Sequence, residues 1–525
     1  MKKVIYCALS VMNALLYSGC IDRQNIESSD HSDSSTRIVI DGLFEDWESV
    51  ATGVEDQGDA PGAEFDLGRV RTQHDHDYVH VMISIDRDLN VQGLDGSLSM
   101  LVDVDGRPTT GVVQDRMTGV DLIVQFTPPN ERDPTQRGMG IGVISPTDIP
   151  NPETESRSIG HGDIGFKMAP TYASQHIEFS MSRHSSLPGV PALFQGRSFA
   201  LKFILTSKGG IITDETEVMN HVLTATQFGK LDRPRLGNVT AKEDDTLRLM
   251  TWNVEFGTIL KKTAVYERIL NLIDPDVLLL QELTPAESST ALLSFLNNRV
   301  SKGNEEWHLI LSQSGGSIGC GIATRLPIEP VSDIALIARP DRPDWFVRAL
   351  GGKVTLSNGR RLLVASLHLK CCGRIGSEED QTRLLEVKLI NRAIKKAILS
   401  GQFDGIVIGG DLNLVGGYEP IESLGAGLDF DQSDLTILHP YRLDNRSNAT
   451  WGNPRGRFAP GRLDYLLMSG SSLIEKESFV FNSTEVSPES LAGYPLKLDD
   501  SAEASDHYPI VLDLTWNESI RDTAI

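Results

Sequence analysis

The chain has 525 residues, 40% of them hydrophobic and 23% charged, which excludes a peptide, bulk disorder and a multi-span membrane protein. The formal net charge of −23 repels phosphate backbones and anionic membrane surfaces at long range, so an anionic substrate needs local cations. With 47 Gly, 25 Pro and only 6% aromatic residues, the composition favours many turns and short strands over long helical bundles.

Residues 1–20 have the pattern of a bacterial-type secretion signal. Lys2 and Lys3 precede an apolar run over 4–17 that is short for a membrane span, and small residues follow. The segment ending at Cys20 resembles the lipobox of bacterial lipoproteins, with Tyr17 where that motif usually has Leu. The resemblance implies lipidation of Cys20. We expect an exported protein: a periplasmic or outer-membrane-anchored lipoprotein, or a secreted one, touching membrane only through its anchor.

Residues 21–36 are polar and rich in Ser and Asp, so we predict a disordered tether there. Beyond the signal, the cysteines are Cys320, Cys371 and Cys372. An odd number without CxxC spacing argues against a disulfide framework and against a zinc site. Structural thiols, or one disulfide between Cys320 and one of the adjacent pair, remain the alternatives.

Residues 37–227 read as short strands of period two, such as YVHVMISID and FALKFILT, separated by Gly, Pro and Asp turns. Because no amphipathic helix interrupts them, we predict an antiparallel β-sandwich. Three segments, IDGLFEDWESV, DLGRVRTQHDHDYVHVMISID and LVDVDGRPTTG, resemble a family 9 carbohydrate-binding-module-like sandwich. The resemblance implies a domain that binds a surface, a glycan or a partner.

Two polar clusters lie in this region. Asp103 and Asp105 fit either a tight turn or a Ca²⁺ site, and we favour the turn. A second cluster follows the first long strand: His74, Asp75, His76, Asp77 and His80. We interpret it as solvated polar residues at a hairpin mouth rather than as a metal site.

Residues 228–245 lose periodicity and gather charge, Pro and Gly, which predicts a linker. Over 246–517, apolar strands alternate with helices, including one around Tyr266–Leu272 and an amphipathic one over Glu379–Leu399. The pattern predicts a layered α/β domain, and hence an α+β multidomain chain.

In this second domain nearly every apolar strand ends in a polar side chain able to take part in catalysis. Rigid strands position such groups well. Carboxylates, carboxamides and imidazoles together suit hydrolysis of a phosphate ester with a hard divalent cation. The residues are Asn253, Glu282, His368, Asp411, Asn413, Asp464, Asp506 and His507.

The motifs around these residues, TWNVEFG, LLLQEL, ASLHLK, GGDLN, RLDYLLMS and SDHYPIV, resemble the endonuclease/exonuclease/phosphatase family in the same order. The resemblance covers 247–514. The family includes pancreatic-type deoxyribonuclease, abasic-site endonucleases, neutral sphingomyelinases and inositol polyphosphate 5-phosphatases. It implies a four-layer α/β/β/α sandwich and a Mg²⁺-dependent phosphoric ester hydrolase, with Mn²⁺ as a substitute.

The resemblance also implies roles. Glu282 matches the metal-binding glutamate, with Asn253 and Asp506 completing the metal region. His507 matches the base that activates water, oriented by Asp464. The remaining matches concern the phosphate: Asp411 and Asn413 orient the nucleophile and donate to phosphate oxygens, and His368 contacts the phosphate or helps protonate the leaving oxygen.

Residues outside the motifs add to the site. Arg348 fits either a substrate-binding cation or a surface salt bridge. Trp451, in a Thr450-Trp451 segment that resembles one in the family, either lines the site or packs, and we favour packing. The loop after His368 carries Lys370 and Arg374 and ends in a Ser377 capping box, so we predict a specificity loop.

We therefore predict an exported metal-dependent phosphohydrolase, with a phosphodiesterase favoured and an extracellular nuclease slightly ahead. Exposed apolar loops for membrane insertion are not evident, which places a phospholipid or sphingomyelin phosphodiesterase second, beside a phosphomonoesterase. The alternative from another class is a non-catalytic surface-binding lipoprotein.

Overall fold

The computed structural model describes residues 37–518 except 61, 131–137, 147–158, 188–189, 225–232, 286–288, 301–304 and 313–315. The predicted signal, Cys20 and the tether lie outside the described residues, as does part of the predicted linker. Residues 37–525 form one compact unit by their contacts. Within the described part, no helix is both long and apolar enough to cross a membrane.

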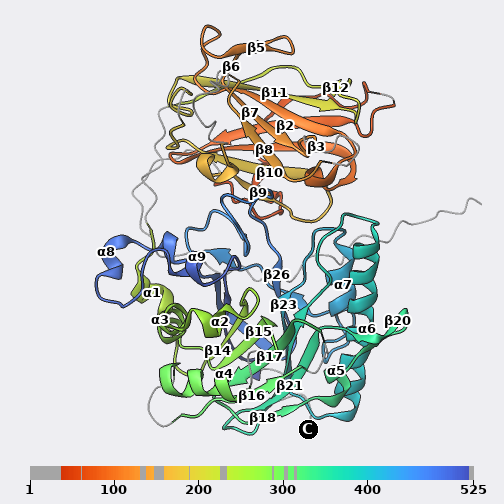
Figure 1. The fold of residues 1–525 in the computed structure, drawn as a ribbon, viewed down its shortest axis with the longest axis vertical. Helices are drawn as coiled ribbons and strands as arrows, with labels where there is room; N and C mark the ends of the chain where they lie inside the picture. Colours follow the sequence, from red (N-terminus) through yellow and green to blue (C-terminus); the bar gives the residue numbers. More distant parts are fainter. Residues whose placement is uncertain are drawn as a thin grey trace, which may run out of the picture. The chain divides into compact units, whose positions relative to one another are not determined.

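The N-terminal part contains two antiparallel sheets, with strand orders β1-β2-β3-β10-β9 and β12-β11-β4-β7-β8, and β13 also pairs with β11 (Figure 1). Period-two patterning produces them: in β7, Leu122, Val124 and Phe126 are buried while the residues between them are half-buried. The strands are β1 (Thr52–Val54), β2 (Leu67–His74), β3 (Tyr78–Leu89), β4 (Ser97–Asp103), β5 (Val112–Gln114), β6 (Met117–Val120), β7 (Leu122–Phe126), β8 (Ile141–Ile144), β9 (Lys167–Ala169), β10 (Ser174–Ser182), β11 (Ser198–Thr206), β12 (Ile212–Glu215) and β13 (Met219–Val222).

Two details of this part bear on the sequence interpretation. Asp103 Oδ1 accepts backbone hydrogen bonds from Asp105, Gly106 and Arg107, which confirms the turn. The interpretation of the histidine cluster as solvated is wrong for His74 and His80, which are 6% and 2% exposed. His74 bonds to His221, which the sequence does not place beside it, whereas His80 bonds to Asp75 of the same cluster.

The C-terminal part is built on two larger sheets among the described residues, ordered β16-β17-β15-β14-β28-β27-β25 and β18-β21-β22-β23-β26-β24. The strands are β14 (Leu247–Asn253), β15 (Val277–Leu283), β16 (His308–Leu311), β17 (Gly319–Thr324), β18 (Ile328–Pro330), β21 (Ala349–Thr355), β22 (Arg361–His368), β23 (Gly405–Asp411), β24 (Thr436–Ile437), β25 (Tyr441–Arg442), β26 (Asp464–Met468), β27 (Leu473–Val480) and β28 (Ile510–Trp516). A separate hairpin consists of β19 (Ala338–Arg339) and β20 (Arg342–Phe346).

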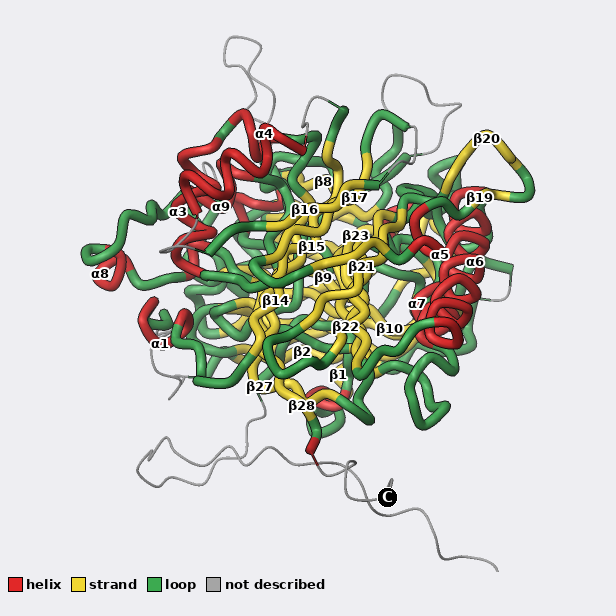
Figure 2. The backbone as a smooth tube through the Cα atoms, turned by 90° about the horizontal axis from the view of Figure 1, so that it is seen from below, coloured by secondary structure: helices red, strands yellow, loops and turns green. Residues whose placement is uncertain are grey.

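Helices lie on both outer sides of these sheets (Figure 2). They are α1 (Leu236–Thr240), α2 (Thr258–Lys261), α3 (Thr263–Ile273), α4 (Ser289–Phe295), α5 (Ser332–Ala335), α6 (Glu378–Ser400), α7 (Glu419–Gly425), α8 (Pro488–Leu491) and α9 (Asp500–Ala504). The two predicted helices are confirmed, as α3 and α6. Helix α6 begins where Ser377 Oγ accepts the Asp380 N–H, and it buries Val387 and Ile394, seven residues apart and therefore on one face.

In the C-terminal domain, three apolar clusters fill the spaces between the two sheets and between each sheet and its helices. Leu249 and Leu279 of one sheet meet Val364 and Val407 of the other in the central cluster. Tyr266 of α3 lies in the cluster on the outer face of the seven-stranded sheet, and α6 and α7 cover the six-stranded sheet. The predicted fold class, an antiparallel β-sandwich followed by a four-layer α/β/β/α sandwich, is confirmed.

The β-sandwich contacts loops of the second domain. Asn448 Nδ2 donates to the Asp41 carbonyl at 2.7 Å, and the Arg462 N–H donates to Thr171 Oγ1 at 2.8 Å. The Arg446 guanidinium pairs with the carboxylate of Asp75. These contacts fix the segment from Arg446 to Arg462, which leads into the candidate site.

Candidate active site

The strand ends gather the predicted residues at one edge of the two sheets. His368 and Asp411 are register partners on the parallel strands β22 and β23, and Asp411 also pairs with Asp464 on β26. Asn253 ends β14, which is parallel to β15, the strand that carries Glu282. Parallel strands end at the same edge of a sheet, so residues far apart in sequence meet there.

Two carboxylates and an imidazole form the centre of the site. Asn253 Nδ2 donates to Glu282 Oε1 at 3.1 Å and to Asp411 Oδ2 at 3.0 Å. His368 Nε2 lies 3.5 Å from each of those two carboxylate oxygens. Asn253 and Asp411 are buried, at 0% and 2% exposure, so this donor and this acceptor are held together away from solvent.

This centre fits a divalent cation. No described Lys or Arg forms an ion pair with Glu282 or Asp411. Burial raises the pKa of Asp411 to about 7, although the charge of His507 opposes this shift. Carboxylate oxygens are the ligands that Mg²⁺ and Mn²⁺ prefer, and ligand atoms of Glu282, His368 and Asp411 lie within 4.8 Å of one another.

Asp506 is not in the group whose ligand atoms lie within 4.8 Å of one another, so its place in the metal region stays a prediction. Its Oδ2 accepts a hydrogen bond of 2.8 Å from Trp451 Nε1. The interpretation of Trp451 as packing alone is therefore wrong, since its indole fixes a carboxylate beside the site. Glu282 and Asn253 lie together, joined by a hydrogen bond of 3.1 Å.

His507 forms a pair with Asp464. His507 Nδ1 lies 2.8 Å from Asp464 Oδ2, and His507 Nε2 lies 3.8 Å from Asp411 Oδ2. Burial alone would lower the pKa of His507, but the carboxylate of Asp464, helped by Asp411 and Asp506, raises it above its ordinary range. With Asp464 accepting the Nδ1–H, Nε2 is the nitrogen that can exchange a proton in the site.

Residues at the ends of β23 and β15, and in the turn after β23, have unusual backbone conformations. Gly410 has φ +147°, and a Cβ there would lie 2.0 Å from the Leu367 carbonyl oxygen, so only glycine fits. Asn413 has φ 49° and Glu282 has φ 59°, which are uncommon for side-chain-bearing residues and often mark functional sites. The Asn413 amide donates to the Leu369 carbonyl at 3.3 Å.

Arg348 lies next to His368 instead of in a surface salt bridge. Its Nε donates to the His368 carbonyl at 3.2 Å, and its side chain is half-buried. After burial, its positive charge is the next cause that lowers the pKa of His368. The placement agrees with the substrate-binding alternative.

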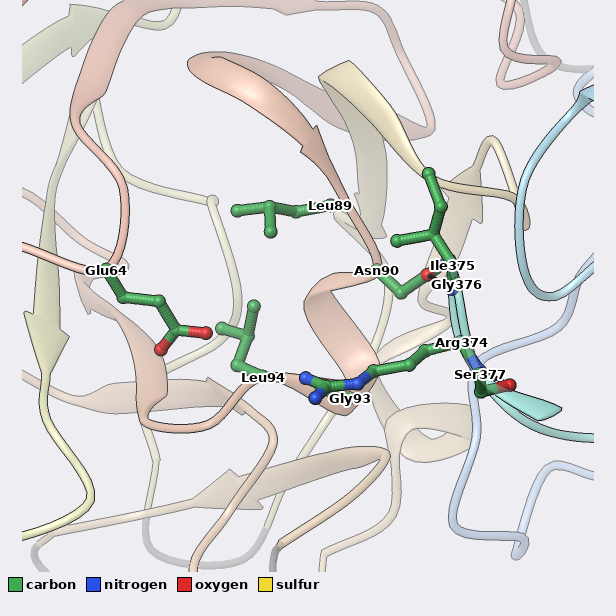
Figure 3. A pocket seen from close by; sticks show the side chains of 9 residues that line it. All are labelled: Glu64, Leu89, Asn90, Gly93, Leu94, Arg374, Ile375, Gly376 and Ser377. Carbon is green, nitrogen blue, oxygen red and sulfur yellow. Dashed lines mark hydrogen bonds between the residues drawn. The ribbon is translucent and has the colours of Figure 1, made fainter. Parts of the chain in front are cut away.

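The predicted specificity loop rests on the β-sandwich. The Ile375 N–H donates to Asn90 Oδ1 at 2.8 Å, and Arg374 Nη1 lies 3.4 Å from the Gly93 carbonyl oxygen. A hollow of about 250 Å³ separates this loop from Glu64 and its neighbours (Figure 3). The sandwich therefore limits the positions that the loop can take.

Sequence reasoning missed several supporting residues. Thr450 Oγ1 donates to Asp464 Oδ2 at 2.7 Å and accepts the backbone N–H groups of Leu463 and Asp464. Ser505 Oγ donates to the Asn253 carbonyl at 2.8 Å. Their only sequence signal is proximity to recognisable motifs.

The described cysteines are free thiols. Cys320 is buried, with its Sγ 3.6 Å from the Arg348 carbonyl oxygen, and Cys371 and Cys372 have their sulfur atoms 2.8 Å apart. The structural-thiol alternative therefore describes them.

Residues 250–507 match the model of the Endonuclease/Exonuclease/phosphatase family. The C-terminal domain of the chain belongs to this family and is a phosphohydrolase domain. The resemblance of the N-terminal domain to carbohydrate-binding modules stays a prediction.

Solved structures similar to this chain cover its C-terminal half. The human Nocturnin catalytic domain with bound sulfate is 19% identical, with a TM-score of 0.35, over 53% of this chain and 97% of that one. D. rerio TDP2 complexed with single-strand DNA product is 19% identical (TM-score 0.34; 52% and 100%). An AP endonuclease from Archaeoglobus fulgidus is 16% identical (TM-score 0.34; 51% and 98%). No curated protein matches the chain.

Proposed function

We propose that the chain is a Mg²⁺-dependent phosphodiesterase that activates water with His507. The observation that carries this proposal is the His507–Asp464 pair, whose free Nε2 faces Asp411 beside Glu282 and His368. A base, its orienting carboxylate and a cluster suited to a cation are the parts that in-line attack on a phosphoester needs.

The side chains act in sequence around the phosphate. His507 Nε2 takes the proton of the attacking water, and Asp464 balances the imidazolium that results. Asn413 donates to phosphate oxygens as their charge grows, which an amide does without the repulsion of a carboxylate. His368 supplies an N–H to the phosphate or the leaving oxygen.

Glu282 and Asp411 would hold the cation, with Asn253 orienting both carboxylates and His368 left to donate its N–H. When bound, the cation neutralises the phosphate and the carboxylates around it. Arg348 adds fixed positive charge next to His368, which a strongly acidic chain needs to hold an anionic substrate.

A nucleic acid remains the favoured substrate, with one observation in favour of a phospholipid. Trp345 lies on the β20 hairpin, three residues before Arg348, and is 61% exposed. The sequence alone did not indicate an exposed apolar side chain in this loop. An exposed indole can stack on an unpaired base or enter a lipid interface. The phospholipid diesterase is therefore the second candidate.

The experiment that tests the proposal is hydrolysis of plasmid DNA, RNA, sphingomyelin, an aryl phosphodiester and an aryl phosphomonoester, with Mg²⁺, Mn²⁺ or EDTA. His507→Ala should lower turnover by about 10²–10⁴-fold, and EDTA should abolish it. His308→Ala, an exposed imidazole on β16, is the matched control. Absence of turnover on every substrate by folded protein would favour the non-catalytic surface-binding lipoprotein.

We further propose that the protein is exported and lipidated at Cys20, and that the β-sandwich binds a glycan or another surface ligand. Mass spectrometry of the mature N-terminus tests the first point, with Cys20→Ser as the control. Binding to immobilised polysaccharides tests the second.

A further inference from the structure

Two imidazoles and a carboxylate that are not part of the candidate active site meet at the mouth of the β2–β3 hairpin. His76 and Asp77 lie in the turn between β2 and β3, and His184 follows β10 by two residues. Strands β3 and β10 are antiparallel with Ser182 opposite Tyr78, and this register brings His184 beside the turn.

The three side chains converge on one oxygen atom. His76 Nδ1 lies 2.9 Å from Asp77 Oδ1, and His184 Nε2 lies 3.1 Å from the same oxygen. Tetrahedral coordination with bonds of about 2.0–2.1 Å places ligand atoms about 3.3 Å apart. Outward shifts of a few tenths of an ångström would therefore let these atoms surround one ion.

The surroundings hold the carboxylate and leave the imidazoles accessible. The Asp77 side chain is 14% exposed, while those of His76 and His184 are 40% and 53% exposed. The Asp77 N–H donates to Asp75 Oδ1 at 2.7 Å, and the Arg183 N–H donates to the Asp77 carbonyl at 2.8 Å. Such support orients a metal ligand, and the open side admits water as a further ligand.

Arg446, the described cation that contacts Asp77, is already neutralised by another carboxylate. Arg446 Nη2 lies 3.4 Å from Asp77 Oδ2, but the same guanidinium pairs with the carboxylate of Asp75. Its charge therefore does not by itself exclude an ion at Oδ1, the other oxygen of Asp77.

We propose that His76, Asp77 and His184 bind a divalent transition-metal ion of the zinc class. Two neutral imidazoles with one carboxylate suit Zn²⁺ and Co²⁺, whereas Mg²⁺ and Ca²⁺ require mostly oxygen ligands. This donor set differs from that of the active-site cluster, which has two carboxylates and one imidazole. The site would thus coexist with Mg²⁺ in the active site.

Titration of the metal-free mature protein with Co²⁺, followed by visible d–d absorption, tests the proposal, and competition with Zn²⁺ should remove the bands. His184→Ala and His76→Ala should each weaken Co²⁺ binding at least about tenfold. His308→Ala, an exposed imidazole elsewhere, and His368→Ala, which alters the active-site cluster, should keep the bands.

His184→Cys provides a positive test. A thiolate at this position should restore binding and add a sulfur-to-cobalt charge-transfer band. Circular dichroism confirms that each variant is folded. The proposal is overturned if the wild-type protein shows no bands, if His184→Ala and His76→Ala keep them, or if they disappear only in His368→Ala.

Discussion

The Thr450 hydroxyl donates a hydrogen bond of 2.7 Å to Oδ2 of Asp464. The same oxygen lies 2.8 Å from His507 Nδ1, so the hydroxyl helps to hold the carboxylate that orients the proposed base. Thr450 is thus a positioning residue.

Thr450→Val should lower kcat about tenfold with a smaller change in KM, because a hydrogen bond to a charged group contributes about 1.5–3 kcal/mol. Thr450→Ser keeps the hydroxyl and should restore most of kcat. Steady-state kinetics on the best substrate measures both. Equal losses in the Val and Ser variants would assign Thr450 a packing role only.

The Asn413 amide is predicted to act in the transition state. Asn413→Gly removes the side-chain amide, and glycine adopts the φ of 49° at this position without steric cost. A loss of activity would therefore report the missing amide and not a change in backbone conformation. We expect kcat to fall about 10²–10³-fold with KM changed little. An effect on KM alone would show that the amide contributes only to binding.

The contact between buried His74 and half-buried His221 predicts a dependence of stability on pH. Burial, together with His74 and Arg183, lowers the pKa of His221 from 6.5 to about 4. Since folding disfavours protonation, this contribution is complete above pH 6.5 and is lost as the pH falls towards 4.

The difference in Tm between the wild-type protein and His221→Gln should therefore shrink on acidification from pH 7.5 to 5. Thermal unfolding followed by circular dichroism measures it, with His308→Gln as a control that behaves like the wild type. A difference that stays constant across this range would contradict the assignment.

Three carboxylates gather beside the turn at Asp103, and they predict a response to Ca²⁺. Asp121 is 1% exposed, its Oδ1 has no hydrogen-bond partner, and it lies close to Asp103 and Asp105. If Ca²⁺ binds there, a hundredfold excess over Kd adds about 2.7 kcal/mol and raises Tm by several degrees. EGTA should reverse the shift, and Asp121→Asn should be insensitive to Ca²⁺. An equal Ca²⁺ effect in both proteins would place the ion elsewhere.

The sequence predicts which residues of the candidate site lie close together, because each of them stands at or near the end of a strand. His368 and Asp411 each close an apolar run, and parallel pairing then puts them side by side without further information. The supporting contacts are different. Nothing near Trp451 predicts that its indole reaches Asp506, since this depends on the path of an irregular loop.

Side-chain contacts between segments far apart in the chain could not be predicted from the sequence either. The motif around His76 lacks a visible third ligand, because His184 joins it only through the pairing of β3 with β10. His74 looked solvated because the pattern does not reveal that His221, 147 residues away, covers it.

The buried pair of Asp75 and Arg446 spans 371 positions of the chain. Arg446 is 3% exposed, so a hybrid protein with a different N-terminal half would leave a guanidinium buried without its carboxylate, at a cost of about 3–5 kcal/mol. The two halves are consequently not interchangeable modules. A chimera that exchanges the sandwich must also exchange the segment around Arg446, and a cut in the connecting chain would leave the fragments associated.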